Sequence, residues 1–141
     1  MEFDLSRFLK AQESDYDTAL TEIRAGRKRS HWIWYIFPQM KGLGSSSTSD
    51  YYGIRSMEEA KAYLADPILR MRLVEISKAL LPHDTSDPCR VMGYPDDLKL
   101  CSSMTLFAEA DPTEPVFQAV LDKYYGGRKD GETLRLLNQI K

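Results

Sequence analysis

Apolar residues recur at helical spacing along most of this chain, and polar, glycine or proline residues interrupt them at short intervals. Residues 3–9 place phenylalanine and leucine on one face and predict a short first helix. Asp15 or Asp17 is a suitable cap for a second helix, which we expect to end at Gly26. The amino-terminal quarter is therefore predicted to contain two helices.

The most aromatic stretch lies at residues 30–44, SHWIWYIFPQMKGLG. Ser30 can cap a helix that reaches Phe37, because Pro38 disfavours helical geometry in the residue before it. The run IWYIF also suits a strand, but nothing nearby resembles a pairing partner, so we favour a helix. The glycine- and serine-rich residues 42–53 are predicted to form a loop.

Capping signals place the helices of the second half. Ser56 and Glu59 form a capping box, and the Asp66–Pro67 pair begins a helix that stops at Pro82. We expect a surface turn at residues 83–88.

Three more helices are expected to begin near Pro95, at Pro115 and at Asp130. The one from Pro115 ends at the glycines of 126–127. The pattern predicts an all-α, compact single domain over residues 1–141, built from six or seven short helices.

Composition narrows the class of partner. The chain has 141 residues, 43% hydrophobic, and a formal net charge of −2. This charge gives no general attraction to nucleic acid or to an anionic membrane, and no apolar run approaches the roughly 20 residues of a membrane span. Cys89 and Cys101 are interpreted as free thiols in a reducing cytoplasm.

The loop after the aromatic stretch has one candidate chemistry. KGLGSSST differs from a phosphate-binding P-loop, because Lys41 precedes the glycines instead of following them. The backbone amides around Gly42, Gly44 and Ser46 can still form a nest that binds an anion. The alternative is an ordinary mobile surface loop.

Histidine offers two further candidates. A zinc site built from His31, His83 and the two cysteines lacks paired ligand spacing, so we predict no metal and no cofactor. His31 can act as a general base only if an acid such as Asp97 lies near it in the fold. The competing interpretation makes His31 a packing or capping residue.

Aromatic and basic side chains extend the same hypothesis. Trp32, Trp34 and Phe37 can stack on a flat ring or belong to the core. The upstream basic cluster of residues 24–29, which includes Arg29, either stabilises a helix end or recognises phosphate. Both alternatives stay open.

A second polar concentration falls in GYPDDLKLCSSMTLF. Lys99, Ser102 and Ser103 share a helix face, and buried hydroxyls need partners. Lining a pocket is one way to supply these partners.

The strings HWIWYIFPQMKGLGSSS, YYGI and GYPDDLKLCSSMTLF resemble, in this order, the bacterial domain-of-unknown-function family 1810. The resemblance covers nearly the whole chain and implies a compact, mostly helical fold without an established activity. Some members are labelled calpastatin, but a folded, core-rich domain is unlike a disordered inhibitory peptide. The motif positions are His31, Trp32, Trp34, Phe37, Pro38, Gln39, Gly42, Gly44, Ser46, Asp97, Lys99, Ser102 and Ser103.

Together these features predict a small cytoplasmic domain that binds, or hydrolyses, a nucleotide-like or phosphorylated small molecule of the NAD or ADP-ribose type. The tryptophans would form an apolar wall, Gln39 would bind a polar edge, and residues 42–46 with Arg29 would hold an anion. His31 and Asp97 are the acid–base candidates. The alternative is a non-catalytic protein-interaction module with an exposed aromatic surface.

Overall fold

The computed structural model describes residues 3–139 of the chain. In these residues the regular structure consists of helices and one isolated β-bridge. Residues 1–2 and 140–141 lie outside this range. The helices are α1 (Ser6–Arg24), α2 (Ile33–Ile36), α3 (Ser47–Tyr52), α4 (Met57–Ala65), α5 (Pro67–Ala79), α6 (Pro88–Met92), α7 (Asp96–Ala110), α8 (Pro115–Tyr125) and α9 (Gly131–Gln139). The all-α prediction is confirmed.

The capping signals act as their chemistry predicts. The Ser56 hydroxyl accepts from the backbone N of Glu59 at 3.1 Å and begins α4. The Asp66 carboxylate accepts from the amides of residues 68 and 69 and begins α5, with Pro67 as its first residue. Gly126 ends α8 in the left-handed conformation at φ +62°.

The two helices predicted before Gly26 are a single helix, α1. Neither Asp15 nor Asp17 caps it, and one buried stripe continues past both. Gln12 belongs to this stripe, because its side chain donates to the Tyr35 carbonyl at 2.8 Å and to the Tyr63 hydroxyl at 2.9 Å. Because Gln12 is polar, the sequence pattern divided the one buried face of α1 into two short apolar stretches.

Two short helices were not predicted, one inside an expected loop and one directly after an expected turn. Residues 42–53 contain α3, which the Ser46 hydroxyl caps by accepting from the Ser49 amide at 3.1 Å. The turn predicted at residues 83–88 runs into α6, where Asp87 accepts from the Cys89 amide at 3.0 Å. Both helices are too short to show an apolar period in the sequence.

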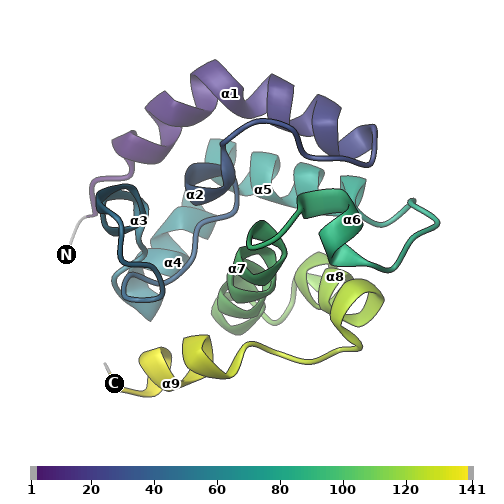
Figure 1. The fold of residues 1–141 in the computed structure, drawn as a ribbon. Helices are drawn as coiled ribbons and strands as arrows, with labels where there is room; N and C mark the ends of the chain where they lie inside the picture. The colour runs from purple at the N-terminus through teal and green to yellow at the C-terminus, as the bar shows by residue number, and fades with distance from the viewer. Residues whose placement is uncertain (1–2, 140–141) are drawn as a thin grey trace.

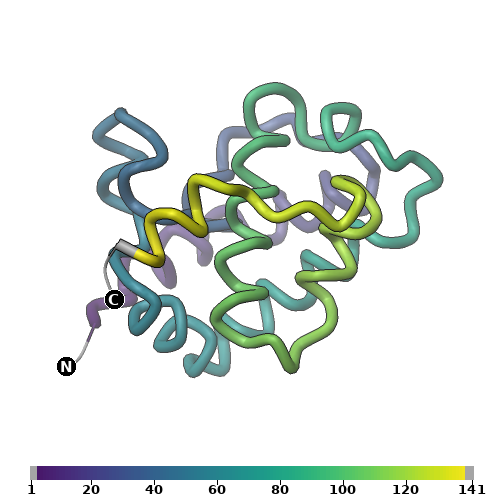
Figure 2. The backbone as a smooth tube through the Cα atoms, turned by 90° about the horizontal axis from the view of Figure 1, so that it is seen from below, coloured from purple at the N-terminus to yellow at the C-terminus, as the bar shows by residue number. Residues whose placement is uncertain are grey.

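Helix α7 lies at the centre of the fold and packs against α2, α4, α6, α8 and α9 (Figure 1). Its buried residues run almost without interruption from residue 100 to residue 110. Figure 2 shows the chain after α8 crossing one side of α7. None of the helices within residues 3–139 combines the length and the apolar character that a bilayer span requires.

Candidate functional site

The segment that leads into α2 is held by one carboxylate. Glu22 Oε1 accepts from the backbone N of Arg29 and of Ser30 at 2.8 and 2.9 Å, and from Trp32 Nε1 at 2.9 Å. Its Oε2 accepts from the Ser30 hydroxyl at 2.6 Å. Burial raises the pKa of Glu22, but these hydrogen bonds outweigh it and lower the pKa to about 2. Trp32 is 1% exposed, so it is a core residue fixed by Glu22.

Four of the predicted ligand-binding residues do meet. Trp34, Phe37, Gln39 and Lys99 line one cavity, together with Ile33, Ser49, Tyr52 and Gly53. The ammonium of Lys99 lies 5.0 Å from the centroid of the Trp34 ring. The aromatic segment, the serine-rich segment and α7 therefore border a common space, which Gly42, Gly44, Ser46, Ser102 and Ser103 do not line.

The size of this cavity limits its occupant. Its volume is about 10 Å³, close to the smallest space that holds one water molecule. A nucleotide needs several hundred Å³, so it fits there only if these side chains and the segment after them move apart.

The predicted anion nest serves local structure. Gly42 takes φ +104° in the turn, and the Ser46 hydroxyl caps α3. Gly44 lies so close to Ser49 that a Cβ at this position would be 2.6 Å from the Ser49 hydroxyl oxygen. These residues fix the path of the chain into α3.

The two acid–base candidates, His31 and Asp97, have different surroundings. His31 is exposed and lines none of the grooves of residues 3–139 described here. Asp97 is half-buried, and its Oδ1 is a buried atom without a hydrogen-bond partner in the described part of the chain. No hydrogen bond or ion pair joins the two within residues 3–139, so their joint acid–base role stays a hypothesis.

The hydroxyls of α7 divide between two environments. Ser102 donates to Asp130 Oδ2 at 3.0 Å and helps hold the start of α9. Ser103 is fully buried, and its hydroxyl oxygen lacks a partner among residues 3–139. Arg29 is exposed and contributes only its backbone N to the contacts above.

A larger groove lies where the basic cluster of α1 meets the segment after α5. It has a volume of about 780 Å³, and we call it the basic groove. Its lining residues are Gly26, Arg27, Lys28, His83, Asp84, Thr85, Cys89, Arg90 and Gly93.

One backbone–backbone hydrogen bond and one side-chain contact bring these distant segments together. The backbone N of Lys28 donates to the Val91 carbonyl at 2.7 Å. His83 Nε2 lies 2.6 Å from the Ile23 carbonyl, and its ring sits beside Gly26, which takes φ +85°. Because the carbonyl can only accept, Nε2 carries a proton and donates it to Ile23.

The charge of the basic groove is unevenly compensated. Lys28 is nearly buried, with its ammonium 2.7 Å from Asp96 Oδ2 and 2.5 Å from the Ser30 carbonyl. Arg27 and Arg90 are exposed and have no ion-pair partner within residues 3–139. Asp84 is the one acid that lines the groove in the described chain. Positive charge therefore predominates, which suits an anion.

The sequence predicted a basic cluster on one side of this groove, but the residue singled out from it, Arg29, does not line the groove. The run of basic residues near Arg27 had suggested phosphate recognition, but His83 and Arg90 come from a segment about sixty residues further along the chain. No local pattern signals that the two segments meet. Within residues 3–139, no three histidine, cysteine or acidic side chains are grouped as metal ligands.

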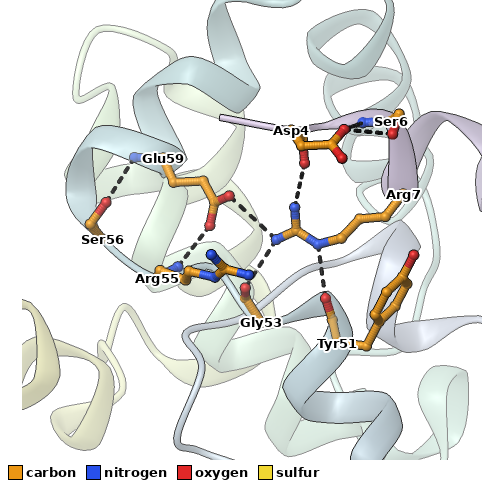
Figure 3. Close-up of polar contacts among 8 residues, drawn as sticks. All are labelled: Asp4, Ser6, Arg7, Tyr51, Gly53, Arg55, Ser56 and Glu59. Carbon is orange, nitrogen blue, oxygen red and sulfur yellow. Dashed lines mark hydrogen bonds and ion pairs between the residues drawn. The ribbon is translucent and has the colours of Figure 1, made fainter. Parts of the chain in front are cut away.

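A third groove surrounds Arg7, but its guanidinium is already occupied (Figure 3). Arg7 donates to the carbonyls of Tyr51 at 2.8 Å, Asp4 at 2.7 Å and Gly53 at 3.1 Å. It also pairs with Glu59 Oε2 at 3.4 Å. Arg7 thus joins α1 to the segment between α3 and α4 and has little capacity left for a ligand.

The exposed-aromatic alternative depends on other residues than expected. Trp32 is buried and Trp34 is half-buried, whereas Tyr51 and Tyr94 are 59% and 76% exposed. An interaction surface that uses aromatic side chains would have to include these tyrosines, and it stays a hypothesis.

Comparison with known proteins agrees with the motifs. The family model described as "Protein of unknown function (DUF1810)" matches residues 2–137. The chain belongs to this family. The resemblance inferred from the motifs is therefore confirmed.

One solved structure of similar fold is that of the conserved hypothetical protein Rv1873 from Mycobacterium tuberculosis. It is 50% identical to this DUF1810 chain with a TM-score of 0.94, and the match covers 96% of this chain and 97% of Rv1873. None of the curated proteins matches the sequence. The likeness supports the fold and carries no activity.

Proposed function

We propose that this protein binds a small phosphorylated molecule, nucleotide-like in character, in the basic groove. The observation that carries the proposal is the pair of exposed guanidinium groups of Arg27 and Arg90, neither ion-paired within residues 3–139, on a groove of about 780 Å³. This volume lies within the range of ligand pockets, and guanidinium groups bind phosphate oxygens through two parallel hydrogen bonds.

The neighbouring groups support the same ligand. His83 is held by Ile23 through Nε2, so Nδ1 is the ring nitrogen for a hydrogen bond with a ligand group such as a ribose hydroxyl. Lys28, although paired with Asp96, adds a fixed positive charge behind the groove. The proposal is binding only, because hydrolysis needs an acid and a base in contact with the same ligand. The compartment proposed is the cytoplasm, since Cys89 is an exposed free thiol.

Calorimetric titration of the full chain with inorganic phosphate, AMP, ADP-ribose and NAD tests the proposal. We expect at least one nucleotide to bind, and to bind more weakly at higher salt. Arg90→Gln and Arg27→Gln should each weaken this binding about tenfold or more, because each removes a charge-assisted hydrogen bond.

Arg29→Gln is the matched control. Arg29 is exposed, belongs to the same basic run and does not line the groove, so this variant should bind within about twofold of the original. The proposal fails if none of the four ligands binds. It also fails if Lys99→Gln abolishes binding while the Arg27 and Arg90 variants bind normally, because the ligand then occupies the aromatic cavity.

A further inference from the structure

A second large groove follows the outer face of α5, and we call it the α5 groove. It has a volume of about 770 Å³ and is lined mainly by apolar surface, including Met71, Val74 and Pro82. Residues 71, 74 and 78 lie on one side of α5, because three or four residues make one turn. The groove therefore extends along a helix of 13 residues, or about 20 Å.

The outer face of α5 mixes apolar side chains with three charged ones that also line the groove. Leu69, Leu73 and Ile76 are buried against the core, while Met71 on the groove side is 55% exposed. The exposed apolar side chains of the outer face can contact an apolar occupant.

The α5 groove and the basic groove meet at one residue, His83, which lines both. Arg24 and Lys78 stand on the rim of the α5 groove, and neither has an ion-pair partner in residues 3–139. Glu114 pairs with Arg70 at 3.4 Å, and Glu75 accepts from the Tyr16 hydroxyl at 2.5 Å and keeps its negative charge. Apolar surface therefore continues at His83 into the basic groove, where positive charge predominates.

We infer that the ligand is an amphiphile, with a phosphate head in the basic groove and an apolar chain along α5. This inference rests on the proposed function, because the head group is the anion assigned there. The occupant is a single free molecule rather than a membrane surface, because two grooves that join at one residue, His83, accommodate one head and one chain.

Titration with butyl, octyl and dodecyl phosphate, each below its micelle concentration, tests the inference. Each methylene that leaves water on binding adds affinity. Because the groove is open on one side, we expect octyl phosphate to bind at least tenfold more tightly than butyl phosphate.

Two variants of α5 separate the chain from the head. Met71→Gln should weaken octyl phosphate several-fold and leave butyl phosphate unchanged. Ile68→Gln is the matched control, because Ile68 is also exposed, at 47%, on the same helix but does not line the groove. Arg90→Gln should weaken both ligands equally, since both carry the same head.

The outcomes distinguish the inference from the proposed function. If butyl and octyl phosphate bind equally well, the apolar chain has no site, and the inference is wrong while the phosphate site stands. If no phosphorylated molecule binds, both fall. If the protein sediments with vesicles containing phosphatidic acid but binds no monomeric alkyl phosphate, the occupant is a membrane surface and the inference is overturned.

Discussion

Side chains that look functional in the sequence can be engaged by a partner elsewhere in the fold. Trp32 is the clearest case, because its indole N–H donates to the Glu22 carboxylate, which also accepts from Arg29 and Ser30. The sequence showed an aromatic residue next to a basic run, and both core and ligand roles were open. Glu22, ten residues earlier, decides between them, and nothing in its local sequence distinguishes it from an ordinary exposed glutamate of a helix.

Glu22 should make stability depend on pH. Its folded pKa of about 2 lies below its ordinary value of 4.5, so its contribution is complete above about pH 4.5 and is lost as the pH falls toward 2. Glu22→Gln should cost about 1–2 kcal/mol at pH 7 and lose less further stability than the original protein over this pH interval. Urea denaturation at pH 7, 4 and 3 measures both effects.

Glu13→Gln is the control for this experiment, because Glu13 is an exposed carboxylate on the same helix. It should leave the pH dependence unchanged. Equal acid sensitivity of the Glu22 variant and the original protein would contradict the assignment.

Elements whose boundaries depend on local chemistry were predicted well. The starts of α4, α5 and α8 follow from a hydroxyl or carboxylate at the cap, or a proline in the first turn, and these act within three residues. Helix α1 was divided wrongly because Gln12 finds its partners on α2 and α4, far away in the sequence. Helix α3 was missed because packing, rather than propensity, keeps a serine-rich stretch helical.

The approach to α3 should be sensitive to the size of residue 44. A Cβ on Gly44 would lie 2.6 Å from the hydroxyl oxygen and 2.8 Å from the Cβ of Ser49, a buried residue that cannot move without disturbing α3. Gly44→Ala should therefore lower the free energy of unfolding by about 1–3 kcal/mol. Thermal and urea denaturation measure it.

Gly131→Ala is the matched control for this substitution. Gly131 lies at the start of α9. A Cβ added there would have no atom of residues 3–139 within 4 Å, and alanine favours a helix. This variant should be neutral or slightly stabilising. A Gly44→Ala protein as stable as the original would show that the segment before α3 adapts freely.

At the scale of the whole molecule, one nearly buried ion pair joins α1 to α4. The Arg7 and Glu59 side chains are only 10% and 2% exposed, and Arg7 also holds the carbonyls of Tyr51 and Gly53 (Figure 3). Glu59 was predicted as part of a capping box, but its carboxylate accepts from the Arg55 amide at 2.8 Å and pairs with Arg7. A local signal thus supplied a residue that the tertiary structure uses twice.

Arg7→Met should destabilise the fold by about 3–5 kcal/mol, because it leaves the Glu59 charge buried without its partner. Adding Glu59→Gln should restore part of this loss, so that the double variant is more stable than the sum of the two single changes implies. Urea denaturation of all four proteins gives the coupling free energy. Additive losses, or a single loss below 1 kcal/mol, would show that the pair does not act as a unit.

The sequence by itself determined the helical class, most helix starts and the family, because apolar periodicity, caps and motifs act over a few neighbouring residues. The tertiary structure alone decided which polar groups meet. It joined Glu22 to Trp32, reduced the aromatic cavity to about 10 Å³ and placed Arg90 and His83 beside Arg27. The physical reason is that packing brings together segments some sixty residues apart, and no local pattern encodes that distance or the space left between them.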